Sequence, residues 1–392
     1  MKDRLFQRIA AFMISLLLVF TSMGSATFAI GEKDTFEKDG ITYKIIKDRT
    51  EDALGAVQVG NGKFSMTINK KSLQIPETVT NDKNETFKVV AIGDKAFDNS
   101  TEENSLDSVI IPASVISIGN SAFSDLTSLS DVKFAENSQL QVIGDNAFDT
   151  TSIKSIIIPS SVKSVGASAF TKCSKLTSVI MPEGVTSLGD GVFSDNKQLP
   201  SITLPASLTS MGKNVFNNCP SLKNISVVQG NTTYASENGV VYSADKATVV
   251  KYPEGKKDAD FTVPASVKTI GDYAFANNRN IQSVKLPEGV KALGNYAFSK
   301  STGLTSLELG KNLESIGDLA FWNCSRLETL SIPTSLHSIG RNAFYGCSDL
   351  KFVVASEETR TLLKSSGISD ENITLSAPSS EPTFVVNGVM YK

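Results

Sequence analysis

Histidine is almost absent from this chain: its 392 residues include one histidine, His337, with one tryptophan and four cysteines. A single imidazole cannot complete a usual zinc ligand set, and the cysteines lack C-x-x-C spacing. The G-x-S-x-G and phosphate-loop signatures are missing too. We therefore expect no enzyme activity, no catalytic residues, no metal site and no cofactor.

The chain also lacks an excess of basic residues, because its formal net charge is −3. This balance argues against nucleic acid as a partner. With 40% hydrophobic and 20% charged residues, the chain has the composition of a folded protein with a sizeable core.

Long apolar runs are missing as well, and the longest, Ile9–Phe20, is shorter than the roughly 20 residues that a membrane helix needs. Lys2, Arg4 and Arg8 precede this run, and the small-residue segment TSMGSATFA follows it. This order predicts a secretory signal peptide over residues 1–29, cleaved after Ala29 or, nearly as well, after Ala26. We expect an extracellular protein, secreted or on the cell surface, with no membrane span once the signal is removed.

What the chain has in abundance is a repeat. The signature IGDKAF at Ile92–Phe97 recurs ten times, mostly 23 residues apart. Its phenylalanines are Phe97, Phe123, Phe148, Phe170, Phe193, Phe216, Phe275, Phe298, Phe321 and Phe344. Each unit approximates L-x-x-I-x-L-P-x-x-V-x-x-I-G-x-x-A-F-x-x-C, as in Leu176–Gln198.

This period, led by L-x-x-L-x-L, predicts a leucine-rich-repeat solenoid. Leu176, Val179 and Met181 place alternating side chains on one face of a short strand, which Pro182 ends. One coil cannot bury its own apolar face, so the coils must stack. The predicted fold class is a β-dominated, α/β-type, right-handed solenoid of about 23-residue coils with short helical turns and a β-hairpin island.

A glycine follows the first apolar residue of every signature, which indicates either a positive φ or a very close approach by the next coil. The next residue is often Asp or Asn, and we expect it to cap one helical turn. These residues are Asp94, Asn120, Asp145, Asp190, Asp272, Asn295 and Asp318. A calcium ladder is the alternative, but one carboxylate per coil falls short of the six to eight oxygens that calcium takes.

The repeat resembles that of the BspA-like, Treponema-type leucine-rich-repeat proteins of bacteria and some protozoa, over roughly Ile41–Leu375. The resemblance implies a secreted or surface-displayed binding protein, with adhesion to host matrix or to other cells as the commonest suggested role. It implies no catalytic residues.

The predicted domains are a signal peptide (1–29), a β-rich N-terminal cap (30–90), the solenoid (91–355) and a C-terminal cap (356–375). An island at about 230–260 lengthens the interval between Phe216 and Phe275. We expect it to project as a β-hairpin, with a turn at Ala244-Asp245-Lys246. It either covers a junction between coils or binds a partner through Tyr234, Tyr242 and Tyr252.

Residues 376–392 are predicted to be a linker followed by the start of a possible further module. The last nine residues, FVVNGVMYK, match FEKDGITYK at Phe36–Lys44 as F-x-x-[DN]-G-[IV]-x-Y-K. The chain is then a fragment of a longer protein; alternatively, the tail folds back as a terminal hairpin.

The cysteines Cys173, Cys219, Cys324 and Cys347 each lie three residues after a repeat phenylalanine. We expect buried, free thiols that hydrogen bond to local backbone groups. Only Cys324 and Cys347 lie in adjacent coils, and parallel side chains make a disulfide torsion awkward there. His337 falls in an exposed, variable column, so we expect it and Cys347 on different faces of the coil.

Outward strand positions form columns that are mostly small and polar. Ile157 and Ile180 are apolar neighbours in one column, and with Thr203 they are the strongest candidate contact residues, although single exposed apolar side chains are ordinary. Sugars would need aromatic platforms, and the columns offer only Phe352. A protein ligand, such as a host matrix or cell-surface protein, and a monomeric state are therefore expected. The alternative function is a non-catalytic spacer that presents an enzyme or anchor domain located beyond the chain end.

Overall fold

The structure is a computed structural model that describes residues 35–48, 50, 53–61, 66, 70–99, 105–376, 384–386 and 389–391, with side chains up to residue 376. Its contacts divide the chain into two units, Met1–Thr35 and Phe36–Lys392, and the second contains all the repeats. The predicted signal peptide, most of the predicted linker and part of the tail motif lie outside the described residues.

Each coil of the repeat contributes two short parallel strands. The longer strand, which carries the alternating apolar residues, is β4 (Ser72–Gln74), β7 (Ser108–Ile111), β9 (Asp131–Phe134), β11 (Ser155–Ile157), β13 (Ser178–Ile180), β15 (Ser201–Leu204), β17 (Asn224–Val227), β21 (Asp260–Thr262), β23 (Ser283–Lys285), β25 (Ser306–Glu308), β27 (Thr329–Ile332), β29 (Lys351–Val354) and β30 (Ile373–Leu375). The two-residue strand before the repeat glycine is β8 (Ser117–Ile118), β10 (Val142–Ile143), β12 (Ser164–Val165), β14 (Ser187–Leu188), β16 (Ser210–Met211), β22 (Thr269–Ile270), β24 (Ala292–Leu293), β26 (Ser315–Ile316) and β28 (Ser338–Ile339).

The other elements lie before, within and after the repeats. They are β1 (Thr35–Lys38), β2 (Ile41–Lys47), β3 (Gly55–Val59), β5 (Thr78–Thr80), β6 (Thr86–Ile92), β18 (Tyr234–Glu237), β19 (Val240–Ser243), β20 (Thr248–Lys251), α2 (Glu357–Ser365), the 3-10 turn η1 (Asp370–Asn372), β31 (Phe384–Val386) and β32 (Val389–Tyr391).

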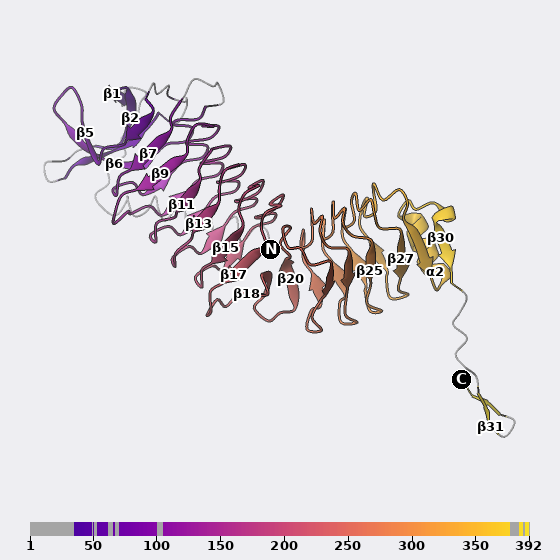
Figure 1. Cartoon of the computed structure of the whole chain (residues 1–392). Coiled ribbons are helices and arrows are strands. Elements are labelled where there is room, and N and C mark those ends of the chain that lie inside the picture. The colour runs from indigo at the N-terminus through magenta and orange to yellow at the C-terminus, as the bar shows by residue number, and fades with distance from the viewer. Residues whose placement is uncertain are drawn as a thin grey trace. The chain divides into compact units, whose positions relative to one another are not determined.

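Stacking of these coils gives a β-solenoid of about 12 turns, as the repeat predicts. The longer strands follow one another side by side in chain order (Figure 1), and the short strands form two parallel ladders, β8 to β16 and β22 to β28. Register is kept from coil to coil: Ile156 pairs with Val179, and Leu188 with Met211. Each coil therefore buries its apolar side chains against the same positions of its neighbours.

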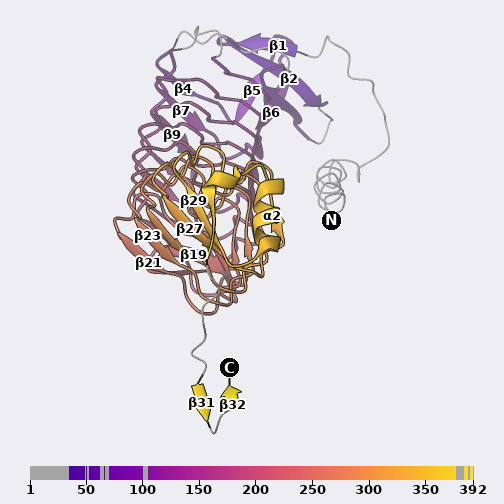
Figure 2. The ribbon, with the colours of Figure 1, turned by 90° about the vertical axis from the view of Figure 1, so that its right-hand side faces the viewer.

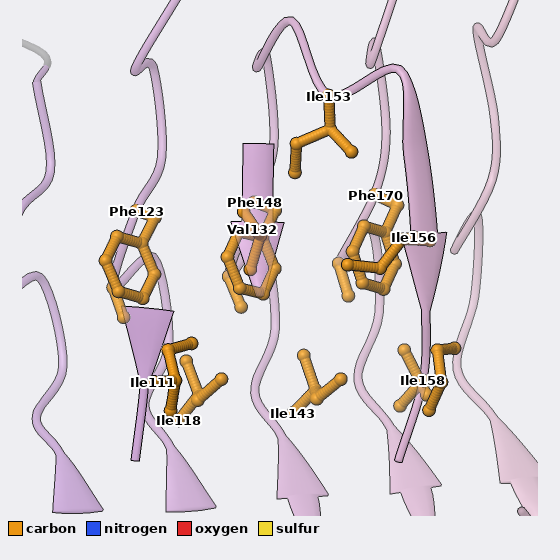
Figure 3. Packing of buried hydrophobic residues seen from close by; sticks show 14 of the residues in the cluster. Ile111, Ile118, Phe123, Val132, Ile143, Phe148, Ile153, Ile156, Ile158 and Phe170 are labelled. Atoms are coloured by element: carbon orange, nitrogen blue, oxygen red, sulfur yellow. The ribbon is translucent and has the colours of Figure 1, made fainter. Parts of the chain in front are cut away.

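The repeat phenylalanines form two columns of stacked rings, one from Phe97 to Phe216 and one from Phe275 to Phe344, which together we call the spine. All ten are at most 7% exposed. Phe123, Phe148 and Phe170 occupy corresponding places in three successive coils (Figure 3), with ring centroids 5.1 and 5.3 Å apart. Each ring thus buries its faces against the rings of neighbouring coils.

The repeat glycines are explained by close approach between coils, because none of them has a positive φ. A Cβ atom at Gly144 would lie 2.7 Å from the Gly119 carbonyl carbon and 2.8 Å from the Asn120 nitrogen. Both are backbone atoms of the preceding coil, so they cannot yield by rotating a side chain.

We expect Gly144→Ala to destabilise the protein by about 1–3 kcal/mol through this overpacking. The measurement is the free energy of unfolding from urea titration followed by circular dichroism. Glu136→Ala, at an exposed position between β9 and β10, is the control and should change stability by less than about 0.5 kcal/mol. Equal stability of the two variants would contradict the close-approach explanation.

The prediction that the Asp or Asn after each glycine caps a helical turn is wrong. Its side-chain Oδ1 instead accepts a hydrogen bond from the backbone N–H of the corresponding residue in the next coil, as Asp94 Oδ1 does from Asn120 N (2.7 Å). The same bond occurs at Asn120, Asp145, Asp190, Asp272, Asn295 and Asp318. These side chains therefore link coils, and the segment up to the phenylalanine is a turn without a helix.

Among the described residues, the one α-helix is α2, beside β29 at the end of the repeats (Figure 2). Ser356 caps it, its side chain accepting a hydrogen bond from Thr359 N at 3.2 Å. None of the described helices is long and apolar enough to cross a membrane.

The island contains the expected hairpin, β19 and β20, but it does not project from the solenoid. β20 pairs in parallel with β22, which continues the ladder of short strands. The ring of Tyr252 stacks on that of Phe275, with the two centroids 5.2 Å apart. The backbone N–H of Tyr252 donates to Ala274 O in the next coil, and the spine phenylalanines make the equivalent bond to their next coil. The island is therefore an irregular coil in which tyrosine replaces phenylalanine.

Tight turns occur at one Asp-Gly pair and one Asn-Gly pair. Asp39 and Gly40 have φ of 54° and 79°, and Asn238 and Gly239 have φ of 50° and 80°. Two positive φ values in succession are typical of a type I′ hairpin turn. In the tail, β31 and β32 pair in an antiparallel manner. Whether a further module follows stays a prediction.

Candidate functional site

The outward face of β9, β11, β13 and β15 holds the predicted contact residues. Ile157 and Ile180 are 63% and 52% exposed and are directly paired across β11 and β13. Their neighbours Ile156 and Val179 point inward and are buried. We call Ile157 and Ile180 the isoleucine patch.

The surroundings of the isoleucine patch are polar. Thr203 is exposed on β15, as predicted, and pairs with Ser226 on β17. On the other side, a shallow hollow of about 540 Å³ separates Ile157 from Lys133 on β9. The Lys133 ammonium lies 3.0 Å from the Asp131 carboxylate, and both side chains are at least half exposed. The patch is thus an apolar centre with a charged border on one side.

The three tyrosines of the island do not join this surface, and their proposed role as exposed contacts is corrected for two of them. Tyr242 and Tyr252 are 3% and 0% exposed, because their strand and turn belong to the core. Burial raises the pKa of Tyr242 to about 12. Tyr234 is half-buried, and its hydroxyl accepts a hydrogen bond from Met211 N at 3.0 Å.

Phe352 is also placed differently from the predicted outward column. It pairs with Leu330 and is 1% exposed, whereas the outward position of β29 is taken by Val353, opposite Ser331. The last coil is one residue shorter than the period, so an alignment at a fixed spacing of 23 slips by one position.

A second group of aromatic residues, which the strand columns could not reveal, lies on the turns of the later coils. Tyr273 and Tyr296 stack at 4.6 Å and line a hollow of about 350 Å³ with Arg341. Trp322 carries the Lys300 ammonium 4.6 Å from its ring centre, and Tyr345 is 66% exposed. The sequence did indicate these residues, in two columns of the repeat outside the strands. One column lies two residues after the repeat glycine, and the other lies one residue after the repeat phenylalanine. We call these four aromatic residues the aromatic edge.

The backbone at Tyr273 and Tyr296 has φ of 57° and 56°, where bulky residues are rare. Equivalent positions in other coils hold Asn146, Gly191 and Asn214, which tolerate this conformation better. The two tyrosines therefore carry a backbone cost that their stacking has to offset.

All four cysteines are free and Cys173, Cys219 and Cys324 are buried, as predicted, but Cys347 is partly exposed. All four thiols donate to the carbonyl oxygen of a spine phenylalanine in the preceding coil, as Cys219 does to Phe193 O at 3.1 Å. Burial raises the pKa of the Cys173 and Cys219 thiols to about 12, so both stay neutral. His337 is exposed, away from any cysteine cluster, and the described residues contain no group of three or more side chains able to hold a metal.

Coils of about 23 residues, a buried ring in each coil and an outward strand face define a leucine-rich-repeat solenoid. Residues 90–223 and 254–372, more than half of the chain, match the BspA-type leucine-rich-repeat region in six copies. The chain belongs to this family, as its resemblance implied.

Two crystal structures share this architecture over 90% of the chain at 25% sequence identity. The pneumococcal vaccine antigen PcpA has a TM-score of 0.77, with 98% of that chain covered. A leucine-rich cell surface protein from Faecalibacterium prausnitzii has a TM-score of 0.65, with 97% of that chain covered. No curated protein matches the sequence.

Proposed function

We propose that the protein is secreted or displayed at the cell surface and binds another protein, in adhesion to host or neighbouring cells. The observation that carries the proposal is the isoleucine patch: two paired isoleucines, each more than half exposed, on a rigid strand face. Membership in a repeat family whose solved relatives include a surface protein and a vaccine antigen supports it. No catalytic role is proposed.

The energetics of the patch fit a contact centre. Covering the exposed part of each isoleucine would contribute about 1–2 kcal/mol. Lys133 and Asp131 at the border add charge that favours orientation and association rate more than affinity. Protein interfaces commonly have an apolar centre within a polar rim.

The test uses beads coated with the folded protein, scored for adherence to cultured host cells, together with surface plasmon resonance on fibronectin, laminin and collagen. Ile157→Asp/Ile180→Asp should reduce adherence and weaken any measured affinity at least tenfold, because two carboxylates would have to be desolvated at the contact. Circular dichroism checks the fold of each variant.

Two matched variants sharpen this test. Ser306→Asp/Thr329→Asp adds the same charge at outward positions of β25 and β27 and should leave adherence unchanged. Trp322→Ala/Tyr345→Ala removes half of the aromatic edge. Loss of adherence in that variant alone would transfer the contact to the aromatic edge and eliminate the isoleucine patch.

The alternative function, a spacer that presents a further domain, predicts that the wild-type beads adhere no better than uncoated ones. That result would reject adhesion by this chain. The repeated hairpin motif, in β1–β2 and again in β31–β32, is the observation that favours the alternative.

A further inference from the structure

Cys324 and Cys347 are neighbours in the last two repeats. The backbone around them is paired directly, with Phe321 N bonding to Ala343 O (2.7 Å) and Asn323 N to Tyr345 O (2.8 Å). Neighbouring coils at about 4.8 Å lie within the Cα separation of 4.4–6.8 Å that disulfides span.

The other cysteine pair lacks this proximity and serves as an internal comparison. Cys173 and Cys219 are separated by a whole coil, in which Asn196 takes the cysteine position and donates to Phe170 O and Phe193 O. Two coil spacings exceed the reach of a disulfide.

The two neighbouring thiols differ in access and in acidity. Cys324 is 0% exposed, whereas Cys347 is partly exposed in the last repeat. Interaction between the two thiols lowers the pKa of Cys347, while the same interaction and burial raise the pKa of Cys324. A thiolate that solvent can reach, beside a buried second thiol, is the arrangement in which exchange with an external disulfide begins at one sulfur and is resolved by the other.

We propose that Cys324 and Cys347 are a modification site, at which a low-molecular-weight disulfide converts the two thiols to one intramolecular disulfide. The Cys347 thiolate attacks one sulfur of the external disulfide, forming a mixed disulfide and releasing one small thiolate. Cys324, as its thiolate, then attacks the Cys347 sulfur, forms the protein disulfide and releases the second small thiolate. The two protein thiols lose two electrons and two protons, which the two released thiols take up.

The surroundings tolerate the loss of both thiol hydrogens. Phe298 O and Phe321 O accept these S–H groups in the reduced protein, at 3.0 and 2.9 Å. Each carbonyl keeps a backbone donor, Ser301 N for Phe298 and Cys324 N for Phe321. No buried acceptor is therefore left without a partner when the bridge forms.

The experiment incubates the folded full chain with oxidised glutathione, quenches with acid, and measures thiols in denaturant, intact mass and the cross-linked peptides. We expect four thiols before treatment and two after it, a mass lower by two hydrogens, and one peptide pair joining Cys324 to Cys347. Four remaining thiols, a bridge at any other pair, or covalent dimers would overturn the proposal.

Three variants assign the steps. Cys324→Ser should keep one glutathione bound at Cys347, since the resolving thiol is gone, and Cys347→Ser should form no bridge. Cys173→Ser/Cys219→Ser should oxidise as the wild type does and end with no free thiol. If a single variant fails to fold, peptide mapping of the wild type still decides, because it identifies the bridged residues directly.

Discussion

Replacing Phe148 with alanine is expected to lower the free energy of unfolding by about 3–5 kcal/mol. The ring is fully buried and lies between Phe123 and Phe170, at interplanar angles of 4° and 6°. Removing the ring leaves a cavity. It also removes two ring–ring contacts, each worth roughly 0.5–1.5 kcal/mol beyond the burial of apolar area. Because a solenoid is stabilised mainly between neighbouring coils, the defect weakens two interfaces at once.

The measurement is urea unfolding followed by circular dichroism. Weakened coupling in the middle of the array should also broaden the transition or divide it into two steps. Tyr345→Ala removes an aromatic ring that is 66% exposed and should cost less than about 0.5 kcal/mol. A Phe148→Ala variant as stable as Tyr345→Ala would show that the spine does not hold the coils together.

The register of the core was predictable, because each coil has one large aromatic ring that must pack against the corresponding ring of the next coil. Phe97 and Phe344 are the first and last of these rings, and every repeat phenylalanine between them is buried. The exposure of Ile157 and Ile180 was predictable for a similar reason, since side chains alternate along a strand and their neighbours are core residues.

The irregular coils were not predictable from the period. A search for the repeat phenylalanine misses Tyr252, because the residue at this position is a tyrosine. The turn before Tyr252 is also shorter than in the other coils, so the spacing does not reveal it either. The role of Asp94 and its equivalents was missed since hydrogen bonds between coils depend on the backbone spacing, which local capping patterns do not contain. Both errors concern contacts between coils.

The shortened coil at Tyr252 also buries an ion pair that no sequence motif indicated. Lys251 and Glu254 have side chains 8% and 2% exposed, with their charged atoms 3.5 Å apart. Glu254 accepts a hydrogen bond from Asn218 N of the preceding coil at 2.8 Å, and Lys251 donates to Tyr273 O of the next at 3.4 Å. The pair therefore joins the coils on either side of the irregular one.

Replacing Lys251 with methionine, which keeps the side-chain length but removes the charge, should destabilise the protein by about 3–5 kcal/mol near pH 8. Burial raises the pKa of Glu254, and Lys251 opposes that rise. Without the lysine, the pKa of Glu254 in the folded state rises further above its unfolded value of 4.5. The folded state then binds the proton more tightly than the unfolded state, so the stability gained from protonation is present below the unfolded pKa and lost as pH rises through the folded pKa.

The deficit of Lys251→Met relative to the wild type should accordingly shrink as pH falls from about 8 toward about 4.5. Taking the difference between the two proteins at each pH cancels the titration of carboxylates that they share. The nearby Cys219 thiol does not contribute, because burial raises its pKa to about 12.

The double variant Lys251→Met/Glu254→Gln separates charge from packing. The double variant has no buried carboxylate at this site. It should therefore regain most of the stability that Lys251→Met loses at pH 8, and the steep pH dependence of the single variant should disappear. A single variant equally unstable at both pH values would show that Lys251 contributes through packing of its methylene chain, and that the unpaired charge of Glu254 is not what destabilises this coil.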